Sequence, residues 1–117
     1  MNKRSLGDDY EQIAIAYLKS EGYKIIEQNF RCKIGEIDII ANKDGYVRFI
    51  EVKYRSDKRK GMPEEAVNYK KQKLICKTAS YYIMKHQYSM DIPCCFDVVA
   101  ILDNEIKLYE NAFEYCK

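Results

Sequence analysis

The chain has 117 residues, of which 47% are hydrophobic and 32% charged, with 20 lysines and arginines against 18 aspartates and glutamates. These values are typical of one compact globular domain over residues 1–117, and a net charge of only +2 excludes a global polycation. Because no apolar run approaches the roughly 20 residues that a membrane span needs, and none follows the basic N-terminus, we expect no membrane association, no signal peptide and a cytoplasmic location.

The first 22 residues predict an amphipathic helix. Ser5 can cap its start, Asp8 and Asp9 suit the positive end of the helix dipole, and Gly22 suits its end. The apolar residues recur at steps of three and four, as one buried stripe requires: Leu6, Tyr10, Ile13, Ala14, Tyr17 and Leu18.

Three β-rich runs follow, at 23–30, 36–41 and 47–54. The second and third are separated by Asn42-Lys43-Asp44-Gly45, and Asp-Gly between two such runs predicts a hairpin. The charged stretch from Arg55 to Met62 contains Gly61 and is typical of a loop.

The second half of the chain predicts a helix, a buried strand and an edge strand. Pro63 favours a first helical position, and the apolar spacing carries this helix to about His86. Residues 94–102 form a nearly continuous apolar run, a turn is expected at Asp103-Asn104, and 106–109 predicts a short edge strand. The order α-β-β-β-α-β-β predicts an α/β (α+β) fold with a mixed sheet flanked by helices.

The hairpin places two carboxylates opposite each other. If Asp44-Gly45 is a two-residue turn, counting back along the ladder puts Asp38 directly across from Glu51, with Cβ atoms about 5 Å apart. A four-residue loop gives the same pairing, whereas a three-residue loop shifts it by one. Lys53 shares the face of Glu51 because alternate residues of a strand point the same way.

Two facing, half-buried carboxylates repel each other, and a hard divalent cation would compensate. Mg²⁺ accepts such oxygen ligands together with waters, and with Lys53 nearby it could polarise a phosphate and activate a water for attack on phosphorus. Glu-x-Lys alone is a weak motif that is usually a solvated edge pair. The alternative for Asp38 is a structural ion pair with Lys53 or Arg48.

Cysteine and histidine usage offers no comparable metal site. The five cysteines are irregularly spaced without a C-x-x-C motif, and the only histidine is His86, so zinc is disfavoured.

Basic residues concentrate in the middle of the chain, between Lys53 and Lys77, and such a stretch can follow a phosphate backbone. The plain alternative is a solvated helix face beside a loop. We select as candidate nucleic-acid contacts Arg31, Arg55, Lys58, Arg59, Lys60 and Lys71. The alternative for Lys71 is a position on a solvated helix face. Tyr54 and Tyr69 are the aromatic residues available for stacking on bases.

Asp97 is expected to have a structural role, as an anchor for Arg31 or Lys107.

An ordered set of motifs covers essentially the whole chain. These are Asn29-Phe30-Arg31-Cys32, Gly35-Glu36-Ile37-Asp38-Ile39-Ile40-Ala41, Phe49-Ile50-Glu51-Val52-Lys53, Gly61-x-Pro63-x-Glu65-Ala66-Val67, Phe96-Asp97-Val98-Val99 and Asn111-Ala112-Phe113. In these motifs the sequence resembles the YraN-like family of predicted bacterial endonucleases, which is placed in the PD-(D/E)xK superfamily and is distantly similar to archaeal Holliday junction resolvases.

The resemblance implies a restriction-endonuclease-like core with Asp38, Glu51 and Lys53 as catalytic residues. It implies that Asp38, Glu51 and the Val52 carbonyl bind Mg²⁺, for which Mn²⁺ can substitute, while Glu11 on the first helix assists through water. Without the family, Glu11 would be interpreted as a solvated helix residue. The chain departs from the pattern in having no proline before Asp38 and Lys60 where an aromatic residue is expected before Gly61.

We therefore expect a Mg²⁺-dependent endonuclease that hydrolyses DNA phosphodiester bonds, with branched or junction DNA as a candidate substrate. The alternative is a non-catalytic nucleic-acid-binding module that retains the nuclease fold, and a third reading is a nuclease directed at RNA. A homodimer would suit a two-fold symmetric junction.

Overall fold

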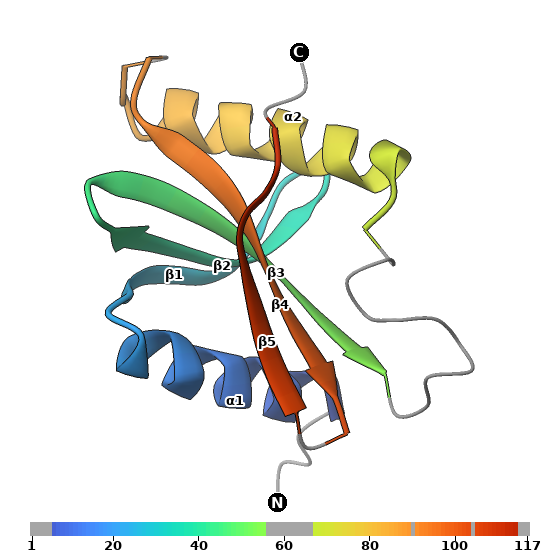
Figure 1. Ribbon diagram of the computed structural model, residues 1–117. Helices are drawn as coiled ribbons and strands as arrows, with labels where there is room; N and C mark the ends of the chain where they lie inside the picture. Colours follow the sequence, from blue (N-terminus) through green and yellow to red (C-terminus); the bar gives the residue numbers. More distant parts are fainter. Residues whose placement is uncertain (1–5, 56–66, 90, 104, 115–117) are drawn as a thin grey trace, which may run out of the picture.

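The computed structural model describes residues 6–55, 67–89, 91–103 and 105–114 (Figure 1). Five strands form one sheet in the order β1-β2-β3-β4-β5, in which β3 and β4 are parallel and every other neighbouring pair is antiparallel. The strands are β1 (Lys24–Arg31), β2 (Glu36–Lys43), β3 (Tyr46–Arg55), β4 (Cys94–Leu102) and β5 (Glu105–Phe113). Together with two helices, this confirms the predicted element order and the mixed sheet.

The helices cover opposite faces of the sheet, as Figure 1 shows. Helix α1 (Leu6–Ser20) buries Ala14 and Leu18 in a cluster with Ile50 of β3. Helix α2 (Tyr69–Lys85) buries one apolar stripe in a second cluster, which includes Phe49. Because each face of the sheet has its own core, β3 and β4 are buried on both sides, and this explains the nearly unbroken apolar run of β4.

The connection between β2 and β3 is a two-residue turn. Asp44 and Gly45 both have positive φ angles, 54° and 81°, and Lys43 pairs with Tyr46. Asp-Gly suits such a turn because aspartate tolerates the left-handed conformation and glycine adopts it without steric cost. The hairpin and its predicted register are therefore confirmed.

Helix α2 begins later than the sequence predicts. Residues 67 and 68 are not helical, and Asn68 is an extended N-cap whose side chain accepts a hydrogen bond from the backbone N–H of Lys71 at 2.9 Å. Asparagine caps compete well for such a boundary, so the predicted start at Pro63 is wrong as a start of this helix. Pro63 itself lies outside the described residues.

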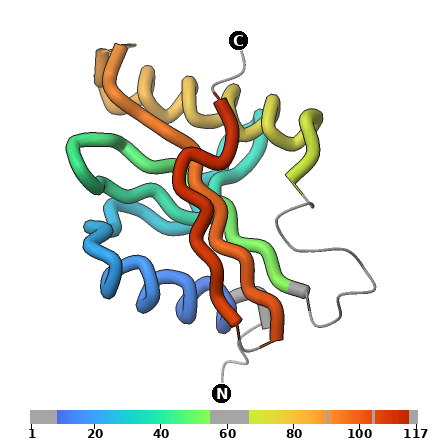
Figure 2. The backbone as a smooth tube through the Cα atoms, in the orientation of Figure 1, coloured from blue at the N-terminus to red at the C-terminus, as the bar shows by residue number. Residues whose placement is uncertain are grey.

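Strand β5 is longer than predicted, because it continues past Tyr109 to Phe113. It runs beside β4, which lies between β3 and β5 (Figure 2). Asn111 has a φ of 52°, and the pairing with β4 shifts between Phe96 and Val98, so an irregularity lets the strand continue. Glu110 and Asn111 interrupt the alternation of apolar and polar residues here, so the sequence pattern does not predict that the strand continues. Among the described residues, no helix is long and apolar enough to cross a membrane.

Candidate functional site: carboxylates and lysines where two strands diverge

The site lies where β2 and β3 separate. Their ladder runs from Lys43–Tyr46 to Ile39–Ile50, and the next step of this register would pair Asp38 with Glu51. Beyond Ile39 the beginning of β2 and the end of β3 diverge (Figure 1). The sheet therefore presents Asp38 and Glu51 at an opening between two strands rather than inside a closed ladder.

Asp38 is half-buried and hydrogen-bonded to the opposite strand. Its Oδ2 accepts a hydrogen bond from the backbone N–H of Val52 at 2.8 Å. Burial and the nearby charge of Glu51 raise the pKa of Asp38 to about 7, with smaller contributions from Glu11 and Glu36, although the Val52 hydrogen bond opposes them. The carboxyl group therefore ionises at the cost of repulsion, and a nearby cation would relieve that cost.

Glu51 is buried, and one of its carboxylate oxygens forms ion pairs with two lysines. Its Oε1 lies 3.3 Å from Lys53 Nζ and 3.0 Å from Lys71 Nζ. Burial and the neighbouring Lys71 ammonium lower the pKa of Lys53. We call Asp38, Glu51, Lys53 and Lys71 the carboxylate–lysine site; it brings together β2, β3 and the first turn of α2.

Glu11 approaches this site from α1. Its Oε1 atom is buried, and its negative charge is one of those that raise the pKa of Asp38. The charge of Glu11 therefore acts on Asp38, although α1 lies on the face of the sheet opposite α2 (Figure 1).

The backbone of Val52 offers a further oxygen at the same opening. In an extended strand the N–H and C=O of one residue point to the same side. Since the N–H of Val52 points at Asp38, its carbonyl also faces the gap between β2 and β3. Asp38, Glu51 and this carbonyl make up a donor set of hard oxygen atoms.

This donor set fits a cation that keeps part of its water shell. In the part of the chain that the structure describes, no three or more histidine, cysteine, aspartate or glutamate side chains are placed to hold a metal ion. Mg²⁺ is commonly bound through one or two carboxylates with waters completing an octahedron, and Asp38 and Glu51 would offer it a site of that kind.

Of the other basic candidates, the structure describes the side chain of Arg31. Arg31 forms an exposed ion pair with Glu36, with 3.0 Å between Nε and Oε2. Arg55 ends β3, but its side chain and the whole of Lys58, Arg59 and Lys60 lie outside what the structure describes.

The two tyrosines considered for base stacking differ. The ring of Tyr54 stacks on Tyr10 with centroids 3.7 Å apart and packs against the α1-side core, so it is occupied within the fold. Tyr69 is 62% exposed, and the ammonium group of Lys73 lies 5.1 Å from its ring centroid.

Asp97 anchors residues other than those expected. It is fully buried and accepts hydrogen bonds from Tyr23 Oη at 2.7 Å, Arg48 Nη1 at 3.3 Å and the Asn111 backbone N–H at 2.8 Å. The predicted partners, Arg31 and Lys107, were therefore wrong. The same network shows that Arg48 is not the partner of Asp38.

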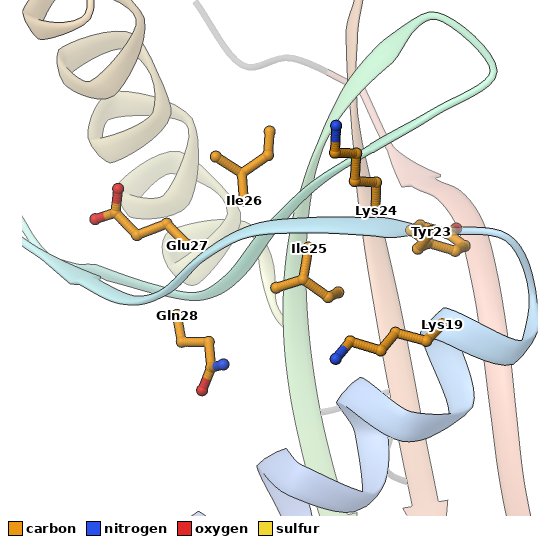
Figure 3. A pocket seen from close by; sticks show the side chains of 7 residues that line it. All are labelled: Lys19, Tyr23, Lys24, Ile25, Ile26, Glu27 and Gln28. Atoms are coloured by element: carbon orange, nitrogen blue, oxygen red, sulfur yellow. The ribbon is translucent and has the colours of Figure 1, made fainter.

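Two hollows in the described surface lie away from the carboxylate–lysine site. One of about 640 Å³ lies between the end of α1 and β1, where Figure 3 shows Lys19 and the β1 side chains around it. The other, of about 450 Å³, is lined partly by Arg48 and Glu110. Neither contains Asp38, Glu51 or Lys53.

Sequence reasoning underrated Lys71, for which a solvated helix face was the favoured interpretation. Its Nζ is the nearer of the two ammonium groups to Glu51. A signal was present: Lys70, Lys71 and Lys73 crowd the start of a helix, where the dipole disfavours cations. The three lysines lie at the start of α2 only because the helix begins after Asn68, and not at Pro63 as predicted.

Comparison with known proteins gives the family. Residues 10–101 match the profile of the uncharacterised protein family UPF0102. The chain belongs to this family. A UPF0102 protein of Lachnoclostridium phytofermentans is 47% identical over 114 residues, covering 97% of both chains. UPF0102 proteins of Thermodesulfovibrio yellowstonii and Clostridioides difficile are 48% and 46% identical over 115 residues, covering 97% of this chain and 99% and 100% of theirs. The match to the UPF0102 family thus extends along almost the full length of this chain, and the range 10–101 spans the positions of the carboxylate–lysine site.

Proposed function

We propose that this UPF0102 protein is a metal-dependent nuclease that hydrolyses DNA phosphodiester bonds at the carboxylate–lysine site. The observation that carries the proposal is the pairing of a half-buried Asp38, whose pKa is raised to about 7, with a buried Glu51 at the opening between β2 and β3. Two carboxylates held together this way gain most from a divalent cation. The family resemblance to PD-(D/E)xK nucleases supports the same assignment.

In this proposal Asp38, Glu51 and the Val52 carbonyl hold Mg²⁺, and Glu11 contributes through water. The bound ion would supply Lewis-acid charge at a phosphate oxygen. Mn²⁺ presents the same charge to the same oxygen ligands and can replace it.

Lys53 acts on the reacting atoms. Its ammonium group lies beside Glu51 and faces the same opening, so it can orient the attacking water and stabilise the charge that develops on the phosphate. The water oxygen forms a bond to phosphorus while the bond from phosphorus to the 3′ oxygen breaks. One proton of the water passes to solvent and the 3′ oxygen takes up another, which gives a 5′-phosphate and a 3′-hydroxyl.

A cleavage panel tests this function. Linear duplex, splayed, flapped and four-way DNA of matched sequence are incubated with Mn²⁺ and the wild-type chain, Lys53→Ala or Lys107→Ala. Lys107 is the control because it is an exposed lysine of β5 in the same sheet. We expect Lys53→Ala to abolish cleavage with DNA binding nearly intact, and Lys107→Ala to cleave as wild type.

The panel also distinguishes the alternatives. Binding of DNA without cleavage of any member, combined with no carboxylate-dependent Mn²⁺ binding, would replace the nuclease with a nucleic-acid-binding module. A matched RNA set in the same assay tests an RNA-directed nuclease. Preference for four-way DNA would give a reason to look for a homodimer in solution.

A further inference from the structure

The position of Lys71 is set by the cap of α2. Asn68 accepts from the Lys71 backbone N–H at 2.9 Å, its carbonyl accepts from the Gln72 N–H at 2.9 Å, and Gln72 Nε2 donates to the Val67 carbonyl at 3.0 Å. These bonds fix the first turn of α2, from which Lys71 Nζ lies 3.0 Å from Glu51 Oε1 of β3. The ammonium group of Lys71 therefore reaches Glu51 from a rigid element rather than from a surface loop.

The two lysines at Glu51 differ in their access to solvent. The side chain of Lys53 is 17% exposed, whereas that of Lys71 is 38% exposed, and both contact the same oxygen of a glutamate whose side chain is 9% exposed. Lys71 therefore lies on the outer side of the site, where a ligand from solvent would arrive. It can leave Glu51 without opening the core.

Glu51 cannot give the same oxygen fully to two ammonium groups and to a metal ion. When a divalent cation takes that oxygen, the attraction that holds Lys71 there weakens and the ammonium groups lose part of their counter-charge. Two lysines in the first turn of α2, Lys70 and Lys71, already oppose the helix dipole. In the metal-loaded site Lys71 would need another anion.

A phosphodiester supplies such an anion. Asp38 and Glu51 would hold the divalent cation, with Glu11 beside it through water, so Glu51 would no longer offer its full charge to Lys53 and Lys71. The phosphoryl group undergoing attack carries about two negative charges on its oxygens, more than the ground state does. Two ammonium groups therefore match the transition state better than one.

Resting on the proposed nuclease function, we propose that Lys71 is a second substrate-contacting lysine, paired with Glu51 when metal is absent and with the scissile phosphate when metal is bound. Lys71 then has opposite effects on the two ligands. It competes with the metal ion for Glu51, and it stabilises the phosphate during attack. A lysine that only bound the DNA backbone would have no effect on the metal.

The test uses the whole chain and the variants Lys71→Gln, Lys71→Arg and Lys73→Gln. Lys73 is the matched control because it lies two residues along the same helix turn, contacts Tyr69 and is exposed. A calorimetric titration with Mn²⁺ alone measures the competition between the metal ion and Lys71 for Glu51. Single-turnover cleavage of the best DNA from the panel, at saturating protein, measures stabilisation of the reacting phosphate. Thermal unfolding confirms that each variant is folded.

We expect Lys71→Gln to bind Mn²⁺ about three- to tenfold more tightly than Lys73→Gln does, because one competing cation is gone. We expect its single-turnover rate to fall by about 10²-fold, the usual effect of losing one charged donor at a reacting centre. Lys71→Arg should keep the wild-type Mn²⁺ affinity because it keeps the charge.

Two results would overturn the proposal that Lys71 moves from Glu51 to the phosphate when metal binds. One is a Mn²⁺ affinity of Lys71→Gln equal to or weaker than that of Lys73→Gln. The other is an unchanged single-turnover rate of Lys71→Gln. Asp38→Asn and Glu51→Gln keep this failure separate from failure of the nuclease assignment. If those variants lose Mn²⁺ binding while Lys71→Gln behaves as the control, only the role of Lys71 is rejected. If they bind Mn²⁺ as wild type does, the metal site itself is rejected.

Discussion

Asp38 of β2 accepts a 2.8 Å hydrogen bond from the backbone N–H of Val52, the residue between Glu51 and Lys53. This bond joins the two strands one step beyond the end of their regular ladder. It orients the Asp38 carboxylate before any ligand arrives, and because it uses Oδ2 it leaves Oδ1 outside this bond. Pre-organisation of this kind lowers the entropy lost when a cation binds.

Replacing Asp38 by asparagine should stabilise the metal-free protein at pH 8. The amide oxygen can still accept from Val52, while the repulsion with Glu51 is removed. We expect the free energy of unfolding to rise by about 1–3 kcal/mol at pH 8 and by little at pH 4, where Asp38 is protonated in the folded protein and largely protonated in the unfolded chain. Urea unfolding in EDTA at both values measures this, with Asp44→Asn as the control for an exposed turn aspartate. Destabilisation at pH 8 would contradict it.

The sign of this effect follows from the raised pKa of Asp38. The folded protein holds the proton more tightly than the unfolded chain, whose aspartates have a pKa of about 3.9. The contribution of Asp38 to stability is therefore complete below about pH 4 and is lost as the pH rises to about 7. An Asp38→Asn protein should lack this part of the pH dependence.

Metal affinity should have the opposite pH dependence. Since the cation binds the ionised carboxylate, Mn²⁺ affinity should fall roughly tenfold per pH unit below about 7, where one proton must be released, and level off above it. Calorimetry at pH 6, 7 and 8 tests this. His86→Asn is the control because it removes the single histidine of the sequence and leaves Asp38 in place. An affinity independent of pH would count against Asp38 as a ligand.

The sequence allowed much of this site to be predicted, because strand alternation and a two-residue turn are local rules. Asp44-Gly45 determined the register, and the register determined that Asp38 and Glu51 lie on facing strands. The position of Lys71 could not be predicted in the same way. It depends on where α2 begins, and the competition between Pro63 and Asn68 for that boundary is not decided by propensity alone.

The partner of Asp97 was unpredictable for a different reason. Arg48 and Asp97 sit on neighbouring parallel strands, β3 and β4, whose relative register is set by packing across a long crossover rather than by a turn. Tyr23 and Asn111 then join from outside those strands. Long-range registers of this kind require the three-dimensional structure.

Asp97→Ala should destabilise the fold strongly. It would leave the guanidinium of Arg48 buried without its carboxylate and remove the acceptor of the Tyr23 hydroxyl. Breaking a buried pair from one side typically costs about 3–5 kcal/mol. Chemical denaturation measures the loss, with exposed Asp91→Ala as the control. Adding Arg48→Met should recover part of the stability; equal loss in the single and double variants would show that the ion pair is not the cause.

Gly35 keeps the start of β2 close to α2, and thereby Asp38 close to Lys71. A Cβ at Gly35 would lie 3.0 Å from Thr78 Oγ1, which is buried and donates to the Leu74 carbonyl at 2.8 Å. Gly35→Ala should therefore cost about 1–3 kcal/mol by overpacking and weaken Mn²⁺ binding as the β1–β2 turn shifts. Thr78→Ala in the same chain should restore part of both losses.

Gly22→Ala is the matched control for this rescue. Gly22 has a φ of 91° and nothing within 4 Å of an added Cβ, so alanine there costs stability through backbone strain alone. Thr78→Ala should not compensate for that loss, and Mn²⁺ affinity should be unchanged because Gly22 follows α1, away from the site. If Thr78→Ala has the same effect on the stability of both glycine variants, the close approach of Gly35 to α2 is not what keeps Asp38 near Lys71.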